Sequence, residues 1–392
     1  MNDLTEVLRA CETAFSDNPS RGRIERLVTT AEQQKDNPLP IYDLAEQCWR
    51  AAYYDLGHHL VKYAFSLPHV TKVALFKRAG EKIRLGDWSG WKDYEARHLR
   101  PRGDSPRGLR ERQLQWSARR WTDYATDISD ETLLIVGEGG FGDYLQTLCF
   151  VPGAIDLARR VILMVKPELT DFVQYNFGRD ADVISTSTDP TGEYDRYALS
   201  FTLPSLFSRI PKFVALRAPQ RRERPFARDD SVLRVGICWA GARYKSPTTG
   251  DLQPSEKSVP DFSLLEPLLF MANVEWYSLQ VGERAGDASS YPCVRAPEPR
   301  LNSFLDTASL LVSLDCIVTV DTSVGHLAGR LGVPTLLLLI CHPDWRWGFA
   351  DKIDWYPSLR LIRQRSPNDW STAITEIRHH LDEFRMSKLN RI

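Results

Sequence analysis

The feature that most constrains the fold is a change of pattern at Glu131, where short β-branched runs begin to alternate with amphipathic helices. A first series predicts strands at 132–136, 161–165 and 197–201, strand material at Val183, and helices at 143–150 and 168–177. A second series predicts strands at 233–238, 274–279, 316–320 and 335–340, and helices at 262–271, 302–313 and 323–331. Such alternation is typical of parallel sheets covered by helices. We therefore expect an α/β fold with two doubly wound Rossmann-like lobes, at 131–225 and 226–370, followed by a closing segment at 371–392 with a helix over 371–384.

Residues 1–100 have a different pattern, with apolar side chains recurring at intervals of three and four, which predicts helices throughout. Two stretches resemble each other: Tyr54 to Gly57, leading to Pro68, and Ile83 to Trp88, leading to Pro101. Each predicts a Leu-Gly turn between two helices and a proline that closes the second helix. We therefore expect an all-α array of helical hairpins, similar to tetratricopeptide repeats.

A linker rich in arginine, residues 101–130, is expected between the helices and the first lobe. A basic strip runs through it from Arg97 to Arg120, and a second basic stretch holds Arg221, Arg222, Arg224 and Arg228. The favoured interpretation is a solvated connector with an ion-paired helix. The alternative is a surface that binds a polyanion such as nucleic acid.

Composition excludes several classes of protein. The 50 basic and 51 acidic residues leave no bulk charge that would require nucleic acid or an anionic membrane. Seven scattered cysteines without a CxxC pair indicate reduced thiols rather than disulfides or a zinc site. The N-terminus has no apolar signal segment, and the longest apolar run, 333–341, is too short to span a bilayer. A soluble, cytoplasmic protein is expected.

The loop after the first predicted strand, residues 137–143, satisfies the GxGxxG pattern of dinucleotide sites. However, the next strand runs into Lys166, with no acid at its end to hold a ribose, so a dehydrogenase is disfavoured. Gly139, Gly140 and Gly142 would instead let a ligand approach the backbone closely. Asp143 then either caps the helix only or, with Glu138, provides catalytic carboxylates, and we favour the catalytic interpretation.

The loop after the strand at 316–320 predicts an anion site. Asp321 ends a buried strand, and Thr322 and Ser323 open a helix whose unpaired amides and positive dipole end suit a diphosphate. His326 lies one turn along the same helix face as Thr322. A helix cap beside a half-buried histidine is the simpler alternative, but four polar side chains at one strand end favour a binding site.

Several ordered motifs together resemble the heptosyltransferase-like glycosyltransferases, the ADP-heptose:LPS heptosyltransferase superfamily, and in particular members with an N-terminal tetratricopeptide region. The resemblance spans about residues 80–385 and rests on 139–143, 235–241, 257–260, 278–280, 315–329 and 343–347. It implies a GT-B fold and inverting transfer from a nucleoside-diphosphate sugar, without a metal ion or other cofactor.

The resemblance also implies roles for individual residues. Asp143 matches the general base, and Lys257 matches a lysine that neutralises donor phosphate. Asp321, Thr322 and His326 match the site for the donor diphosphate and sugar, and Gln280 would lie near the nucleoside. The sole DxD motif, at 180–182, is interpreted as a solvated turn rather than a metal site.

No motif identifies the acceptor. A protein or glycan is expected, and a nucleic acid with a modified base is the alternative suggested by the arginines. A binding scaffold with an inactive transferase lobe is a further alternative from a different class.

Overall fold

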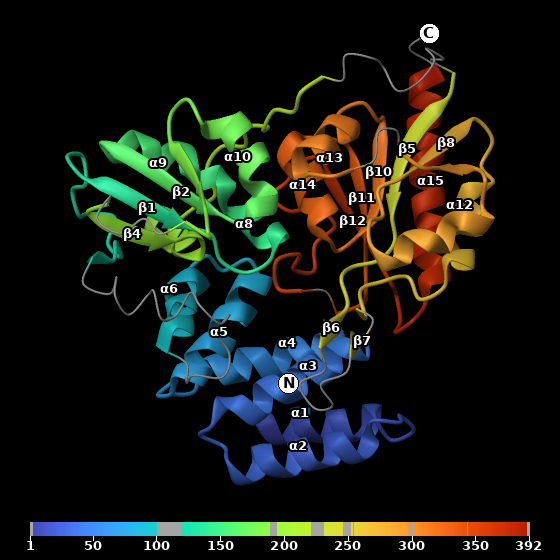
Figure 1. Cartoon of the computed structure of the whole chain (residues 1–392). Helices are drawn as coiled ribbons and strands as arrows, with labels where there is room; N and C mark the ends of the chain where they lie inside the picture. The colour runs from blue at the N-terminus through green and yellow to red at the C-terminus, as the bar shows by residue number, and fades with distance from the viewer. Residues whose placement is uncertain are drawn as a thin grey trace. The chain divides into compact units, whose positions relative to one another are not determined.

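The computed structural model describes residues 3–99, 119–188, 194–220, 231–245, 252–253, 255–297, 301–342 and 344–389 (Figure 1). Contacts divide the chain into two compact units. The helical unit comprises residues 1–104, 340–349 and 363–369, and the α/β unit comprises residues 105–339, 350–362 and 370–392. Most of the predicted linker, with the arginines at 100–118, lies outside the described residues, as do Arg221, Arg222, Arg224 and Arg228.

The first lobe of the α/β unit contains a four-stranded sheet with the strand order β3-β2-β1-β4. All neighbouring strands in it are parallel. The strands are β1 (Thr132–Val136), β2 (Arg160–Val165), β3 (Asp182–Ser185) and β4 (Arg196–Leu199). Its helices are α8 (Phe141–Thr147), α9 (Val151–Leu157), α10 (Thr170–Phe177) and α11 (Leu203–Phe207). Every residue of β1 is buried, as expected for a parallel strand covered on both faces.

The second lobe contains a six-stranded sheet in the order β12-β11-β10-β5-β8-β9. Its strands are β5 (Leu233–Cys238), β8 (Val274–Ser278), β9 (Val294–Arg295), β10 (Cys316–Val320), β11 (Thr335–Leu339) and β12 (Leu359–Arg363). Its helices are α12 (Glu266–Leu269), α13 (Phe304–Leu311), α14 (Ser323–Leu331) and α15 (Trp370–Leu389). A short antiparallel pair, β6 (Tyr244–Lys245) and β7 (Leu252–Gln253), follows β5.

In both sheets the strand order reverses beside the first strand, between β1 and β4 in one sheet and between β5 and β10 in the other. With right-handed crossovers, such a reversal places helices on both faces of a sheet. The predicted fold class is therefore confirmed: two doubly wound lobes of GT-B type follow an all-α region. β5, β10 and α14 have the predicted bounds, whereas β9 and β12 were not predicted and α15 is longer than expected.

The helical unit contains α1 (Leu4–Ala14), α2 (Arg21–Gln33), α3 (Pro38–Arg50), α4 (Tyr54–Phe65), α5 (Lys72–Arg84) and α6 (Gly90–Tyr94). One of its two predicted Leu-Gly turns is wrong. Gly57 lies inside α4, where a Cβ would clash with the Trp49 indole, so glycine is needed there for packing between α3 and α4. Gly86 does lie in the turn after α5, with a φ of +81° that favours glycine. Pro101, the second closing proline, lies outside the described residues.

Segments that follow β11 and β12 complete the core of the helical unit. Phe349 packs on Trp49, with ring centroids 5.1 Å apart, and Trp345 packs on Trp91 at 5.5 Å. Arg363 donates hydrogen bonds to the carbonyls of Phe349, Trp347 and Gly348. The predicted second lobe, 226–370, thus contributes two pieces to a different compact unit.

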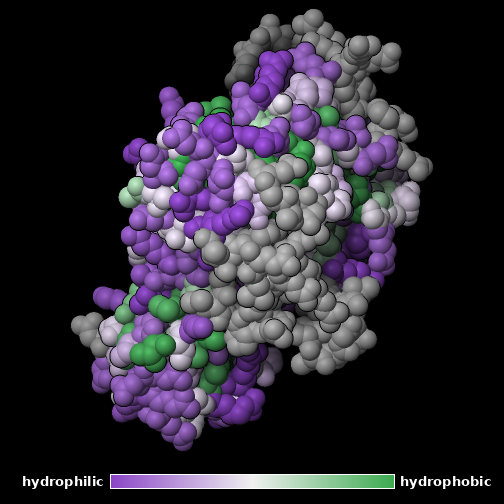
Figure 2. Space-filling view, turned by 60° about the vertical axis from the view of Figure 1, so that its left-hand side comes forward, coloured by the Kyte–Doolittle hydropathy of each residue, from purple (hydrophilic) through white to green (hydrophobic). Residues whose placement is uncertain are grey.

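Hydrophilic residues cover most of the described surface visible in Figure 2, and hydrophobic residues occur there in small separate groups. Among the described helices, none combines the length and the apolar character that crossing a bilayer requires. The described apolar side chains are mainly in the buried cores.

Candidate functional site

The loop after β1 lies at the reversal point of the first sheet, where ligands of doubly wound folds bind. The backbone N–H of Glu138 donates to Ser200 Oγ at 3.1 Å, and the Glu138 carboxylate accepts from the backbone N–H of Phe201 at 3.2 Å. Glu138 therefore fastens this loop to the end of β4. The catalytic role predicted for Glu138 stays a prediction.

Asp143 is the third residue of α8, and its carboxylate accepts from the backbone N–H of Gly140 at 2.5 Å. A Cβ on Gly139 would clash with this carboxylate, and Gly139 has a φ of +71°. The loop glycines thus allow the backbone to fold over Asp143. The carboxylate caps the helix from the third position of its first turn, with Gly140 as the N-cap residue, and its catalytic role stays a prediction.

Helix α14 of the second lobe packs on α8 of the first lobe, through Gly142 and His326. A Cβ on Gly142 would lie 2.5 Å from His326 Cδ2 and 3.0 Å from Nε2, so the imidazole lies directly on the Gly142 backbone. His326 Nδ1 is 2.8 Å from the hydroxyl of Tyr356, and both side chains are buried. The two loops predicted separately from sequence therefore meet at His326.

Lys257 and Asp321 form an ion pair at the reversal point of the second sheet, with 2.5 Å between Nζ and Oδ2. The lysine side chain is 30% exposed and the aspartate side chain 8%. Because a carboxylate repels a diphosphate, Asp321 is better suited to hold Lys257 than to contact donor phosphate. Thr322 is the N-cap residue of α14, and its hydroxyl lies 3.2 Å from that of Thr319. Ser323 is the first residue of the helix, as predicted.

A pocket of about 150 Å³ lies near the start of α14, lined by Gly241, Arg243, Ser255, Ser258, Glu283 and Arg284. Gly241 links it to the helix start, since a Cβ there would lie 3.9 Å from Thr322 Cγ2. The buried hydroxyl of Ser258 accepts from the Gly241 N–H at 3.0 Å. Sequence reasoning missed Arg243 and Arg284, although the position of Arg243 just beyond the end of β5 was an available signal.

Gln280 holds the loop after β5 in place. Its carbonyl accepts from the backbone N–H groups of Trp239 and Ala240 at 3.1 and 2.9 Å, and its amide donates to the Ala240 and Val281 carbonyls. The side chain that was expected near the nucleoside thus braces the loop that carries Gly241.

Metal ligands are not clustered in the described part of the chain, where no group of three or more His, Cys, Asp or Glu could hold an ion. In the DxD motif, Asp182 begins β3 and forms an ion pair with Arg160 at 2.6 Å, so the motif is not simply the predicted solvated turn.

The described ends of the arginine strip have partners in the structure. Arg97 pairs with Glu95 at 2.6 Å, Arg119 donates to the Tyr194 carbonyl, and Arg120 donates to Thr202. These contacts agree with the connector interpretation for the two ends of the strip.

No family profile matches the chain, and no curated protein matches it in sequence. Solved structures do resemble it. A glycosyl transferase family 9 protein from Veillonella parvula has 9% identity and a TM-score of 0.48, covering 68% of this chain and 100% of that chain. ADP-heptose LPS heptosyltransferase II from E. coli has 13% identity and a TM-score of 0.44, covering 66% and 99%. A mutant O-GlcNAc transferase from Thermobaculum terrenum has 13% identity and a TM-score of 0.29, covering 99% and 95%. The chain is thus structurally similar to heptosyltransferase-like glycosyltransferases.

Proposed function

We propose that the chain is an inverting, metal-independent glycosyltransferase that moves a sugar from a nucleoside-diphosphate sugar to an acceptor hydroxyl. The observation that carries the proposal is the meeting of two site loops at the reversal points of two doubly wound sheets. One loop contributes Asp143, and the other contributes His326 together with Asp321, which forms the ion pair with Lys257.

The donor is assigned to the second lobe. Lys257 supplies a partly exposed cation, and the first amides of the nine-residue helix α14 supply donors with no partner inside the helix. Together they would stabilise the negative charge that develops on the leaving nucleoside diphosphate. Asp321 would keep the Lys257 ammonium aimed at that charge through their ion pair.

The base is assigned to Asp143. Inverting transfer needs a group that removes the acceptor proton as the hydroxyl attacks the anomeric carbon, and a positioned carboxylate supplies this chemistry. The bond with the Gly140 N–H fixes one carboxylate oxygen, Oδ2, at the start of α8. His326, packed on Gly142 one residue away, would contact the transferred sugar or its phosphate.

Two substitutions test the proposal, one expected to lower kcat alone and the other expected to weaken donor binding. Asp143→Asn should lower kcat by about 10²–10⁴-fold while the donor Kd stays unchanged, because general-base catalysis contributes that much. Lys257→Ala should weaken donor binding by about tenfold or more, because it removes a charge-assisted contact. Asp171→Asn, at an exposed position on α10, is the matched control and should change neither.

The donor is first identified by thermal shift with UDP-, GDP- and ADP-sugars, because a ligand that binds the folded state raises its melting temperature. Hydrolysis or transfer of the stabilising nucleotide sugar would then separate an enzyme from the scaffold alternative. Stabilisation by no nucleotide sugar, or full turnover by Asp143→Asn, would contradict the proposal. Acceptors are then screened among proteins, glycans and modified DNA, the last with a salt titration.

A further inference from the structure

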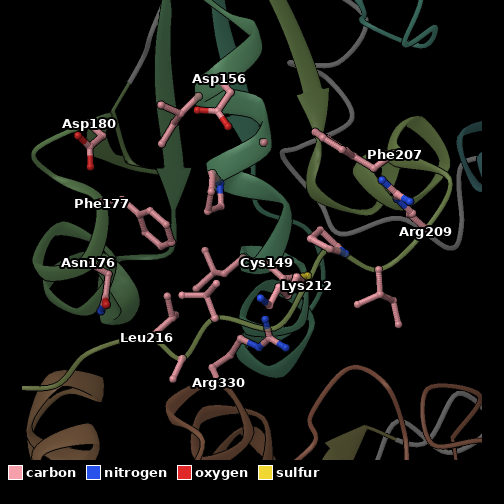
Figure 3. A pocket seen from close by; sticks show the side chains of 18 of the residues that line it. Cys149, Asp156, Asn176, Phe177, Asp180, Phe207, Arg209, Lys212, Leu216 and Arg330 are labelled. Atoms are coloured by element: carbon pink, nitrogen blue, oxygen red, sulfur yellow. The ribbon is translucent and has the colours of Figure 1, made fainter.

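A second cavity of about 1010 Å³ lies in the α/β unit, and none of the residues assigned above lines it (Figure 3). Its walls are α9, the C-terminal end of α10, Phe207 at the end of α11 and the connector segment, residues 208–217, that follows α11. Arg330, near the end of α14, also lines it. The volume is at the upper end of the range of small-molecule sites, roughly 300–1,000 Å³.

The connector segment is a fixed wall of this cavity. The Asn176 side chain accepts from the backbone N–H of Arg217 at 2.7 Å and donates to the Arg217 carbonyl at 3.1 Å. The backbone N–H of Leu216 donates to the Arg330 carbonyl at 2.7 Å. The connector segment is thereby bonded both to α10 and to α14, so the cavity has a defined shape.

Arg330 is the unusual residue in this cavity, because it is 1% exposed and its guanidinium has no carboxylate partner among the described residues. It is stacked between two rings, with Cζ 5.2 Å from the centroid of Phe213 and 4.7 Å from that of Tyr356. One terminal nitrogen donates to the Trp355 carbonyl, while Nε has no hydrogen-bond partner. Because Nε is enclosed by protein, it is the charge that points to a ligand: a buried cation without a carboxylate partner favours an anion beside it.

Other cations line the same cavity. Arg209, Lys212 and Arg217 are exposed on the connector segment, and none pairs with a described carboxylate. Figure 3 shows Lys212 and Arg330 at one end, near Cys149, and the carboxylates of Asp156 and Asp180 at the other end. One end of the cavity is therefore positively charged and the other negatively charged, and the cations outnumber the carboxylates.

Apolar side chains form the rest of the lining, among them Leu148, Ile155, Phe177, Phe207 and Ile210. A small inorganic anion would leave this surface unused, whereas an apolar chain attached to the anion would cover it. The carboxylates of Asp156 and Asp180 would repel a second negative charge at the far end of such a ligand.

We propose that this cavity binds an amphipathic organic anion, with its carboxylate or phosphate head group at Arg330 and Lys212 and its apolar body along Phe177 and Phe207. The site is separate from the proposed donor site and does not depend on the proposed function. Its occupant would contact α9, α10, the connector segment and the end of α14 at once.

The experiment uses the full chain without nucleotide sugar and measures binding of hexanoate and hexyl phosphate by calorimetry, with neutral hexanamide as the uncharged probe. Both anions should bind and hexanamide should bind at least tenfold more weakly. Lys212→Glu should weaken binding of the anions at least tenfold. Lys352→Glu, an equal charge change at an exposed position that does not line the cavity, should leave binding unchanged.

Asp156→Asn is a second variant, expected to have the opposite effect on affinity. Removal of a carboxylate from the cavity should tighten binding of hexyl phosphate. An excess of the nucleotide identified as donor should not displace the probe. Equal binding of hexanamide and hexanoate, an unchanged Kd in Lys212→Glu, or displacement by nucleotide would each overturn the proposal.

Discussion

The two ring nitrogens of His326 have different neighbours. Nδ1 is held by the Tyr356 hydroxyl at 2.8 Å, and the Nε2 side lies against the backbone of Gly142. Whichever of the two partners donates, the bond fixes which ring nitrogen carries the proton and prevents the ring from turning. Tyr356 in turn is stacked on Arg330 and packs on Gly329. We therefore assign Tyr356 as a positioning residue for His326.

Tyr356→Phe should lower kcat about three- to tenfold, because one net hydrogen bond of about 0.5–1.5 kcal/mol that orients the imidazole is lost. The pH profile of kcat should change with it, since the proton on His326 is no longer fixed, and a purely structural role would leave that profile unmoved. Tyr291→Phe, which removes a hydroxyl bonded to Glu266 at 2.7 Å, is the matched control. Initial rates across pH check the prediction, and an unchanged profile would refute the assignment.

Single site residues could be predicted where polar side chains occur in the loop that follows a predicted buried strand. Asp143 and His326 were proposed in this way, because polar residues in the loops after buried strands are costly without a use, whereas Lys257 was proposed only through the resemblance to heptosyltransferase-like glycosyltransferases. Tyr356 and Arg330 were not found, since their partners come from elements far apart in sequence. The bracing role of Gln280 was also hidden, because only the fold shows which backbone groups surround its amide.

Among the elements, the contact between α8 and α14 is the one that joins the two site loops. Gly142→Ala places a methyl group 2.5 Å from His326 Cδ2, so helix or imidazole must move. We expect a loss of about 1–3 kcal/mol in the free energy of unfolding, as for other overpacked contacts, and a larger loss of activity than of donor affinity. Gly140→Ala is the control in the same loop, since its Cβ would meet Asp143 Oδ2 at an ordinary 3.5 Å. Chemical denaturation and kinetics of both variants check this, and equal effects would contradict it.

Strands that are nearly continuous apolar runs were predictable to the residue, as for β1 and β10. Fully buried parallel strands require such runs, so the pattern is strong. The last strand, β12, is at the edge of its sheet and mixes arginines with leucines, which weakens its signal. Gly57 misled the prediction because a glycine required for tight packing inside a helix looks the same in sequence as one required for a turn.

For the whole molecule, the main consequence of the fold is that the helical unit is not continuous in sequence. After β11 and again after β12 the chain contributes residues 340–349 and 363–369 to it. His342 is among them and accepts a hydrogen bond at Nε2 from Arg84 at 2.7 Å. Its ring is stacked on Trp49 with centroids 6.2 Å apart. The stability of the helical unit therefore depends on a residue that is distant in sequence.

This arrangement predicts a pH-dependent stability. Burial, and then the charges of Arg84 and Arg50, lower the pKa of His342 to about 3. The ordinary pKa of a histidine is about 6.5, so between about pH 3 and pH 6.5 the unfolded chain binds a proton at His342 that the folded chain does not. The neutral His342 therefore contributes its full stability above pH 6.5, and this contribution is lost as the pH falls. From pH 7.5 to pH 5 the loss should be about 2 kcal/mol in the free energy of unfolding. Carboxyl groups nearby also titrate, and burial raises the pKa of Glu81, which acts in the opposite direction.

His342→Gln isolates the histidine, because glutamine keeps an acceptor for Arg84 and does not titrate. Denaturant unfolding followed by tryptophan fluorescence at pH 7.5 and 5.0 should show a smaller loss of stability for this variant than for the natural chain, by about 2 kcal/mol. His379→Gln, on α15 with a side chain 71% exposed, should retain the full pH dependence. If His342→Gln loses as much stability on acidification as the natural chain does, the buried neutral histidine is not what makes the helical unit sensitive to acid.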